Sequence, residues 1–240
     1  MLEIENLHAG YGAVSVLQGV SLCVGARETV ALLGTNGNGK STLMKCIMGL
    51  VRARQGSITL TVDGQRIALA EKSTEQIVAL GVAMVPEGRR LFAKLTVREN
   101  LLLGAFRPGA RKEIERNLSL CFEAFPMLRE RSTQLAGSMS GGQQQMLAIA
   151  RAIMSAPRLL LVDEPSVGLS PALVAQMIDT IAQMKQRFGL TVLMAEQNFH
   201  EASRIADRGY VIVHGQIAFA GEDMKALRDS DLVKRYYLGA

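Results

Sequence analysis

The chain has 240 residues, of which 48% are hydrophobic, and its formal net charge is +5. This length buries a full core, as one large domain or two small ones, and no apolar run approaches the roughly 20 residues of a transmembrane helix. The acidic start of the chain argues against a secretion signal, and the three cysteines lack metal-ligand spacing, which favours reduced thiols in a cytosolic protein.

Short runs near the N-terminus alternate apolar and other residues, as half-buried strands do. These runs are residues 2–5, 20–24 and 58–62. The last of them leads into Asp63-Gly64, a strong hairpin-turn signal. We expect these strands to form a small antiparallel sheet.

The run Gly-Thr-Asn-Gly-Asn-Gly-Lys-Ser fits the phosphate-binding template G-x-x-x-x-G-K-[ST]. A buried strand at 28–33 precedes it and a helix at 41–50 follows, so a glycine-rich turn without a ligand is the weaker interpretation. Backbone N–H groups of such a loop surround phosphate oxygens, and the helix N-terminus adds partial positive charge. We expect Lys40 to reach the β- and γ-phosphates of a nucleoside triphosphate and Ser41 to bind Mg²⁺. The expected nucleotide contacts here are Gly34, Thr35, Asn36, Gly37, Asn38, Gly39, Lys40, Ser41 and Thr42.

The segment from Thr96 to Met154 has a helical pattern. Thr96 and Glu99 form a capping box, and breaks are expected at Pro108-Gly109 and at Pro126. Residues 88–135 contain ten basic and five acidic side chains, a difference equal to the whole net charge. A solvated helical face is the default explanation, and a surface near anionic lipid or an acidic partner is the alternative.

Strands return at 159–162, 191–195 and 210–213, and Ser170-Pro171 starts the helix between the first two. The strand at 159–162 ends in Asp163-Glu164. Two adjacent acids after a buried strand are common, but beside a phosphate loop they suit a Mg²⁺-nucleotide site. We expect Asp163 to hold the metal's ligand shell and Glu164 to orient or deprotonate the attacking water.

A third motif, Ser140-Gly141-Gly142-Gln143, opens the apolar helix that ends at Met154. Ser140 and Gln143 are again spaced as a capping box, which is a purely structural alternative. The functional interpretation is phosphate binding at this helix N-terminus.

Together and in this order, the three motifs resemble the nucleotide-binding subunit of an ABC transporter. The resemblance implies an α/β P-loop NTPase fold with an antiparallel β subdomain and an inserted helical subdomain. It divides the single domain 1–240 into a core (1–87 and 155–240) and a helical part (88–154) that meets the membrane-spanning subunits. It also implies head-to-tail dimers in which Ser140, Gly141, Gly142 and Gln143 complete the γ-phosphate site of the other chain, with Tyr11 stacked on adenine.

Three positions depart from the usual pattern of that family. Glu87 stands where most members have a glutamine. Its carboxylate can contact Mg²⁺ or accept a hydrogen bond from the metal's water, but it lacks the amide donor of glutamine. Gln197 stands where most members have a γ-phosphate-sensing histidine, so the resemblance implies a catalytic role for it with Lys40 and Glu164, although an amide does not titrate near neutral pH. Ser170 replaces the usual aspartate, a change expected to alter communication across the dimer.

These departures point to one branch of the family. Pro-Glu-Gly-Arg-Arg-Leu-Phe from Pro86, Glu-Gln-Asn from Glu196 and the ending Tyr237-Leu238-Gly239 resemble the LivF-type ATP-binding subunit of branched-chain (hydrophobic) amino acid uptake systems. That branch implies ATP and Mg²⁺ as ligands. It implies a second ABC ATPase as partner in a homo- or heterodimer, two membrane permease subunits, an external solute-binding protein acting indirectly, and a peripheral place on the cytoplasmic face of the plasma membrane.

The alternatives that stay open are the same role for urea, short amides or other amino acids, a soluble non-transport ABC ATPase, and a non-hydrolysing subunit. The complete set of Lys40, Ser41, Asp163 and Glu164 opposes the last. Nucleic acid is not an expected partner, because the basic excess is small and few aromatic residues are interleaved with it.

Overall fold

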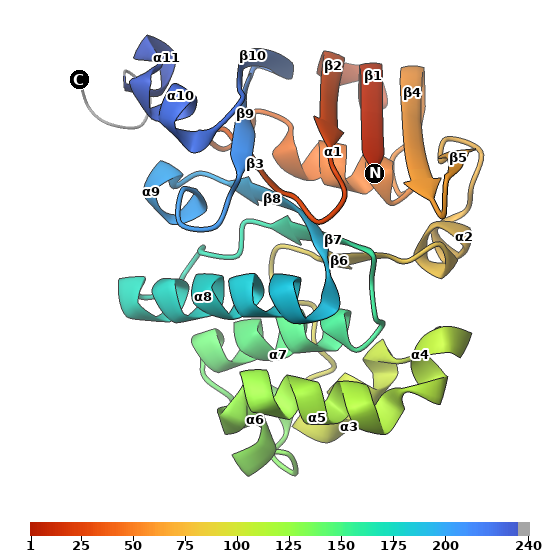
Figure 1. The fold of residues 1–240 in the computed structure, drawn as a ribbon, viewed down its shortest axis with the longest axis vertical. Helices are drawn as coiled ribbons and strands as arrows, with labels where there is room; N and C mark the ends of the chain where they lie inside the picture. The colour runs from red at the N-terminus through yellow and green to blue at the C-terminus, as the bar shows by residue number, and fades with distance from the viewer. Residues whose placement is uncertain (235–240) are drawn as a thin grey trace.

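The computed structural model describes residues 1–234, so the predicted family ending at Tyr237 lies outside the described residues. The strands of this part form two sheets, drawn in Figure 1. The antiparallel sheet has the order β2 (Val14–Val24), β1 (Leu2–Tyr11), β4 (Ala53–Val62) and β5 (Gln65–Ala68). The larger sheet has the order β10 (Gln216–Gly221), β9 (Arg208–Val213), β3 (Thr29–Leu33), β8 (Thr191–Glu196), β7 (Leu159–Asp163) and β6 (Val82–Val85).

The larger sheet is parallel from β9 to β6, and β10 runs antiparallel along its edge. Its faces contact different layers, as alternate residues of β3 show. Val30 and Leu32 pack into a core with the antiparallel sheet and α1, while Ala31 and Leu33 pack into a second core with helices. Strands buried on both faces read as continuous apolar runs, which is why β3, β7 and β8 were predictable.

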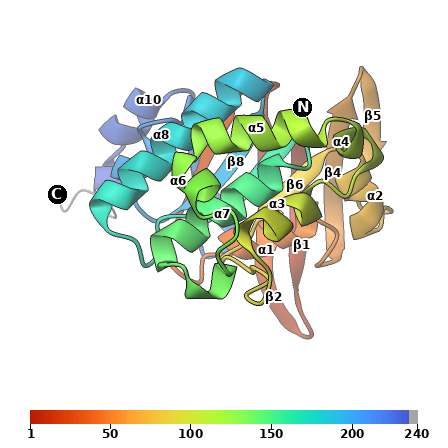
Figure 2. The same cartoon turned by 90° about the horizontal axis from the view of Figure 1, so that it is seen from below.

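Helices lie on both faces of the larger sheet and account for most of the chain between β6 and β7. In chain order they are α1 (Lys40–Ile47), α2 (Thr74–Ala79), α3 (Val97–Gly104), α4 (Pro108–Lys112), α5 (Ile114–Ala124), α6 (Pro126–Glu130), the 3₁₀ helix η1 (Ala136–Ser138), α7 (Gly141–Ile153), α8 (Pro171–Phe188), α9 (Phe199–Ala202), α10 (Met224–Asp229) and α11 (Asp231–Val233). Figure 2 shows α5, α7 and α8 lying together, with α3 beside α7. The predicted mixed α/β fold with a separate antiparallel sheet is confirmed.

Local signals in the sequence explain several element ends. Asp63 and Gly64 have φ of 50° and 80°, the left-handed pair that a two-residue hairpin turn requires, and they join β4 to β5 as predicted. The Thr96–Glu99 capping box is present at the start of α3. Pro108 and Pro126 each stand in the first turn of a helix, α4 and α6, so the predicted breaks are helix starts.

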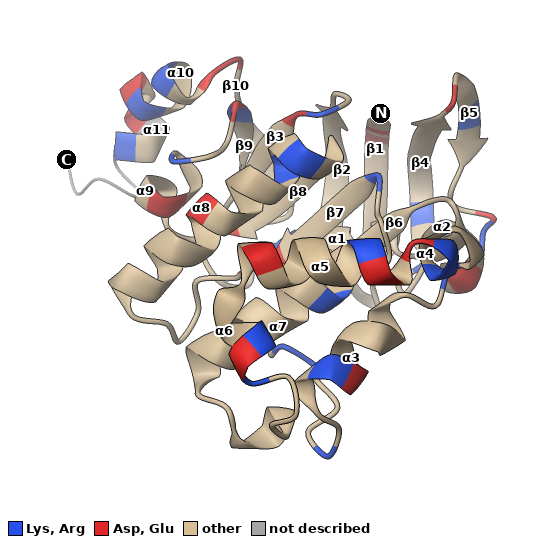
Figure 3. Ribbon diagram, turned by 60° about the horizontal axis from the view of Figure 1, so that its bottom comes forward, with Lys and Arg blue, Asp and Glu red and all other residues tan. Residues whose placement is uncertain are grey.

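Charged side chains of both signs are interleaved on α3 to α6, as Figure 3 shows. Some of them form exposed ion pairs. Glu123 of α5 pairs with Arg187 of α8 at 2.9 Å, and Arg116 pairs with Glu113 at 3.3 Å. Mixed, paired charges of this kind are typical of a solvated helical face. No helix within residues 1–234 is both long enough and apolar enough to cross a membrane.

Candidate active site

The site lies where neighbouring parallel strands of the larger sheet reach their carboxyl ends. Leu33, the last residue of β3, is level with Glu196 of β8, and Asp163 of β7 is level with Ala195. The loop that fits the phosphate template follows β3 directly, so it lies beside the acids that end β7 and β8. Ser41 and Asp163 are 122 residues apart, yet the Ser41 hydroxyl donates to Asp163 Oδ1 at 3.0 Å.

The loop between β3 and α1 keeps its shape through glycine geometry and one buried side chain. Gly37 and Gly39 have φ of 83° and 99°, a backbone region that only glycine enters without strain. Asn38 Nδ2 donates to Thr35 Oγ1 at 2.9 Å, and its Oδ1 accepts from the His214 N–H at 2.9 Å. The loop is therefore fixed both by a bond within it and by the bond from His214, and its first N–H, of Gly34, donates to the Glu196 carbonyl of β8 at 3.2 Å.

Lys40 is buried at the start of α1 and gives its ammonium to three acceptors. They are the carbonyl oxygens of Gly34 at 2.6 Å and Thr35 at 3.1 Å, and Glu164 Oε1 at 2.9 Å. A charged lysine in the interior requires such pairing, since an isolated buried charge is costly. The loop lysine and the acid after β7 are thus in direct contact.

Glu164 also accepts a hydrogen bond from Gln197 Nε2, through its second oxygen, Oε2. Its backbone has φ of 47°, in the left-handed region that residues other than glycine rarely adopt. Such strained positions concentrate at functional sites. The structure therefore brings together all three residues predicted to be catalytic, Lys40, Glu164 and Gln197.

The pKa of Asp163 is raised to about 6, mainly by burial and to a smaller extent by the Glu164 and Glu87 carboxylates, against the hydrogen bond from Ser41 and the charge of Lys40. A carboxyl group that is costly to ionise gains from a nearby cation. Ser41 and Asp163 supply the oxygen ligands that Mg²⁺ prefers, and Mg²⁺ commonly uses one or two protein ligands with waters and phosphates. Residues 1–234 contain no cluster of three or more His, Cys, Asp or Glu that could hold a metal ion.

Two predicted contact residues lie at the margin of this site. Glu87 is exposed on the loop after β6 and acts on Asp163 by charge. Tyr11 is 47% exposed at the tip of the β1–β2 hairpin. That tip is held by Arg54, which donates to the Gly12 carbonyl at 2.6 Å. The stacking role of Tyr11 stays a prediction.

The Ser140–Gln143 motif forms the capping box at the start of α7. Gln143 N–H donates to Ser140 Oγ at 3.4 Å, and Ser140 N–H donates to Gln143 Oε1 at 3.0 Å. Ser140 is exposed, and within residues 1–234 no hydrogen bond joins the motif to Lys40 or Glu164. The motif therefore forms the predicted capping box at the start of α7. The exposed side of Ser140 can still contact a ligand.

Sequence reasoning did not assign two residues of this region. Arg89 lies so close to the motif that a Cβ on Gly141 would be 2.9 Å from its Nη2, and its Nη1 donates to Gln144 at 3.3 Å. Glu196 ends β8 and is fully buried. An acidic residue at the end of an apolar parallel strand indicates a functional position. Glu196 could have been assigned on this ground, since it directly precedes Gln197.

Comparison with known proteins is informative over the whole chain. Residues 17–167 match the model of the ABC transporter family. The chain is 43% identical over 239 residues to a high-affinity branched-chain amino acid transport ATP-binding protein of Pseudomonas aeruginosa, covering 100% of both. It is 36% identical over 221 residues to the "Probable branched-chain amino acid transport ATP-binding protein LivF" of Archaeoglobus fulgidus, covering 92% of each. An ATP-binding cassette of an ABC transporter, solved in its ADP conformation, superposes with a TM-score of 0.81 at 27% identity, over 100% of this chain and 99% of the other.

Proposed function

The chain belongs to the ABC transporter family, and we propose that it is the ATP-hydrolysing subunit that energises import of branched-chain amino acids through a membrane permease complex. The meeting of Lys40, Glu164 and Gln197 beside the phosphate-type loop carries the ATPase part of this proposal. Full-length similarity to two branched-chain amino acid transport ATP-binding proteins supports the transported solute.

ATP binds to the loop after β3, with Lys40 on the β- and γ-phosphates. Ser41 and Asp163 would hold Mg²⁺, which would neutralise part of the phosphate charge. Glu87 would coordinate the metal or accept a hydrogen bond from its bound water, and Tyr11 stacks on the adenine. The Ser140–Gln143 motif of a second ABC ATPase completes the γ-phosphate site.

Hydrolysis requires Glu164 to orient the attacking water or to accept its proton. In the structure its carboxylate is engaged by Lys40 and by Gln197. A triphosphate offers Lys40 better acceptors than the carbonyl groups of Gly34 and Thr35, because charge-assisted hydrogen bonds are stronger than neutral ones. Nucleotide binding thus displaces these carbonyl groups, so that Lys40 connects the phosphates to Glu164, while the Gln197 amide keeps the carboxylate oriented.

An apolar groove supports the partner part of the proposal. It has a volume of about 340 Å³ and lies between β6 and α2 on one side and α3 and α7 on the other. Phe92 and Phe106 on its rim are 54% and 51% exposed, unusual for large apolar side chains. The guanidinium of Arg151 lies 5.7 Å from the Phe92 ring, so the groove combines apolar walls with positive charge. We assign it to a permease segment with an apolar face and an acidic residue, which makes the chain peripheral on the cytoplasmic face.

Co-purification from the native host tests this function. The tagged chain is extracted from membranes in mild detergent, and the proteins that accompany it are identified by mass spectrometry. Two permease chains with a second ABC ATPase, and ATP turnover by the purified complex, are the expected result. Recovery of the chain free of membrane partners would contradict the transport assignment and favour a non-transport ABC ATPase.

A further inference from the structure

Glu196 is a fully buried acid whose contacts reach two separate loops. Its Oε1 accepts from the Ser166 N–H at 3.1 Å, and its Oε2 accepts from the Ser166 hydroxyl at 2.9 Å. The same Oε2 also accepts from the N–H groups of Gln197 at 3.0 Å and Asn198 at 3.5 Å. One carboxylate therefore joins the loop after β7 to the loop after β8.

A buried carboxylate of this kind is expensive to maintain. Burial raises its pKa, and the hydrogen bonds from Ser166, Gln197 and Asn198 oppose that rise. Within the described residues no lysine, arginine or histidine forms an ion pair with Glu196. Its ionised form depends on these donors alone, and the donors depend on it, since a buried N–H or hydroxyl without an acceptor is itself costly.

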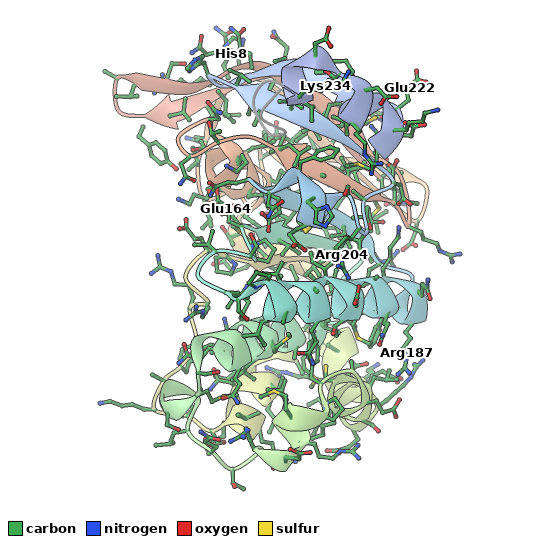
Figure 4. The ribbon with its side chains drawn as sticks, turned by 90° about the vertical axis from the view of Figure 1, so that its left-hand side faces the viewer. His8, Glu164, Arg187, Arg204, Glu222 and Lys234 are labelled. Carbon is green, nitrogen blue, oxygen red and sulfur yellow. The ribbon has the colours of Figure 1, made fainter. Side chains whose placement is uncertain are left out.

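The two loops that Glu196 joins are the ones that surround Glu164. Ser166 is two residues beyond Glu164, and Gln197 donates to the Glu164 carboxylate. Figure 4, in which Glu164 is labelled, shows it at the level of the strands of the larger sheet, above α8 in this view. A shift of either loop would move Glu164 relative to Gln197, because each is fixed to its own loop by the covalent chain.

We propose that Glu196 is a positioning residue for ATP hydrolysis, whose carboxylate holds the Ser166 loop and the Gln197 backbone in one arrangement around Glu164. This inference rests on the proposed ATPase function. It differs from a purely structural role in one respect. Loosening the contact lowers the rate of the chemical step while nucleotide binding, which uses the loop after β3, is retained.

Ser166→Ala is the mildest test, because it removes the hydroxyl bond and keeps the backbone bond to Oε1. In the purified transporter complex we expect kcat to fall by about tenfold or more, since small misplacement of catalytic groups is costly, with ATP affinity within about twofold of wild type. Glu196→Gln should give a larger loss, and Glu196→Asp a partial recovery. Thr180→Val is the matched control, because the Thr180 hydroxyl also makes a single bond, to the Gln176 carbonyl at 2.7 Å, on α8 away from this contact.

Coupling between the two sites is the decisive readout. The double variant Ser166→Ala with Glu196→Gln should be no slower than Glu196→Gln alone, because both changes break the same contact. Wild-type kcat in Ser166→Ala, as in Thr180→Val, would overturn the inference, and so would additive losses that follow the melting temperature. Ser166→Ala carries this test alone if Glu196→Gln does not fold. A wild-type complex without ATP turnover would overturn the proposed function as well, so the two failures are distinguishable.

Discussion

At the scale of single residues, Lys40 links nucleotide binding to catalysis. Its three donors are all taken, two by carbonyl groups of its own loop and one by Glu164 Oε1 at 2.9 Å. A phosphate that engages Lys40 must displace at least one of these acceptors. Both side chains are nearly inaccessible, 2% and 7% exposed, so their attraction is little screened by solvent. The neutral carbonyl groups are the weaker acceptors, so the phosphate displaces them first, and Lys40 then connects the bound nucleotide to Glu164.

Replacing Glu164 by glutamine separates these two roles. We expect turnover to fall by about 10²- to 10⁴-fold, the usual contribution of a general base, with ATP affinity retained or increased. Without ATP the variant should melt at a lower temperature, because removing one partner leaves Lys40 as an uncompensated buried charge. ATP should therefore raise its melting temperature more than it raises that of wild type. Turnover assays and thermal unfolding with and without nucleotide measure both effects.

Glu113→Gln, which changes an exposed carboxylate of the helical segment, is the control for this variant. It should match wild type in turnover and in melting temperature. Near-normal turnover in Glu164→Gln would show that another group activates the water.

Asp163 gives the site a measurable pH dependence. Its pKa is raised from 3.8 to about 6 by burial, so the native state binds a proton more tightly than the unfolded state. The contribution of Asp163 to the free energy of unfolding should therefore be most favourable below about pH 4. It should decrease as the pH rises through about 6. Asp163→Asn should remove that cost and raise stability at pH 7, by an amount on the order of 2–3 kcal/mol.

Denaturant unfolding of wild type and Asp163→Asn between pH 4 and 8 measures this effect in the absence of Mg²⁺ and ATP. The slope should become smaller rather than vanish, because burial also raises the pKa of Glu196. Parallel curves for the two proteins would show that Asp163 is not desolvated in solution.

At the scale of elements, most of the fold follows from local signals. The phosphate-type loop, the Asp63-Gly64 turn and the Thr96–Glu99 box were predictable because each is set by a few adjacent residues. The sequence indicated β1 and β2 only in part, because register shifts interrupt the alternation in both. It did not indicate β10, an edge strand in which exposed and half-buried residues alternate and only Gly221 is buried.

The candidate site was predictable to the same extent and for the same reason. Ser41 and Asp163 each belong to a recognisable motif, and the order of parallel strands then brings them together. The contact of Ser166 with Glu196 has no such motif, because it joins residues 30 positions apart through two irregular loops. Only the strand order β8-β7 reveals that these loops are neighbours.

The loop before α3 offers a test at this scale. Asn100 is fully buried on α3. Its Oδ1 accepts from the Phe92 N–H and its Nδ2 donates to the Phe92 carbonyl, both at 3.0 Å. It also donates to the carbonyl groups of Leu95 and Thr96 at 3.3 and 3.0 Å. Asn100→Ala removes these four bonds and leaves the Phe92 N–H without its acceptor, while the three carbonyl groups keep a backbone donor each. We expect a loss of about 1–3 kcal/mol in the free energy of unfolding, measured by chemical denaturation.

Asn117→Ala is the matched control, since Asn117 is also buried but its Nδ2 has no hydrogen-bond partner within residues 1–234. Its loss should be much smaller. Equal losses would show that the asparagine contacts do not hold the loop that carries Phe92.

At the scale of the whole molecule, the two cores on opposite faces of the larger sheet make different parts of the proposed function possible. One core fixes the loop after β3 against the antiparallel sheet. The other joins the same sheet to α3, α5, α7 and α8, next to the groove assigned to the permease. The division into a core and a helical subdomain with boundaries at residues 88 and 154 stays a prediction. A rigid shared sheet is the physical link between nucleotide and groove.

Phe106→Glu tests the groove, because it places a charge on the rim without touching the nucleotide loop. We expect ATP binding by this variant to be unchanged and recovery of permease chains in a co-purification to fall by about tenfold or more. Leu135→Glu, which alters an apolar side chain of similar exposure outside the groove, is the control. Equal permease recovery from both variants would place the permease contact elsewhere.

Uptake of labelled leucine into proteoliposomes tests the central claim most directly. The liposomes contain the complete transporter complex with ATP on the side of this chain, and the external solute-binding protein is supplied on the other side. The account predicts ATP-dependent accumulation that Glu164→Gln abolishes while the complex still binds ATP. Steady ATP turnover without uptake of any branched-chain amino acid, or uptake that Glu164→Gln does not change, would contradict it.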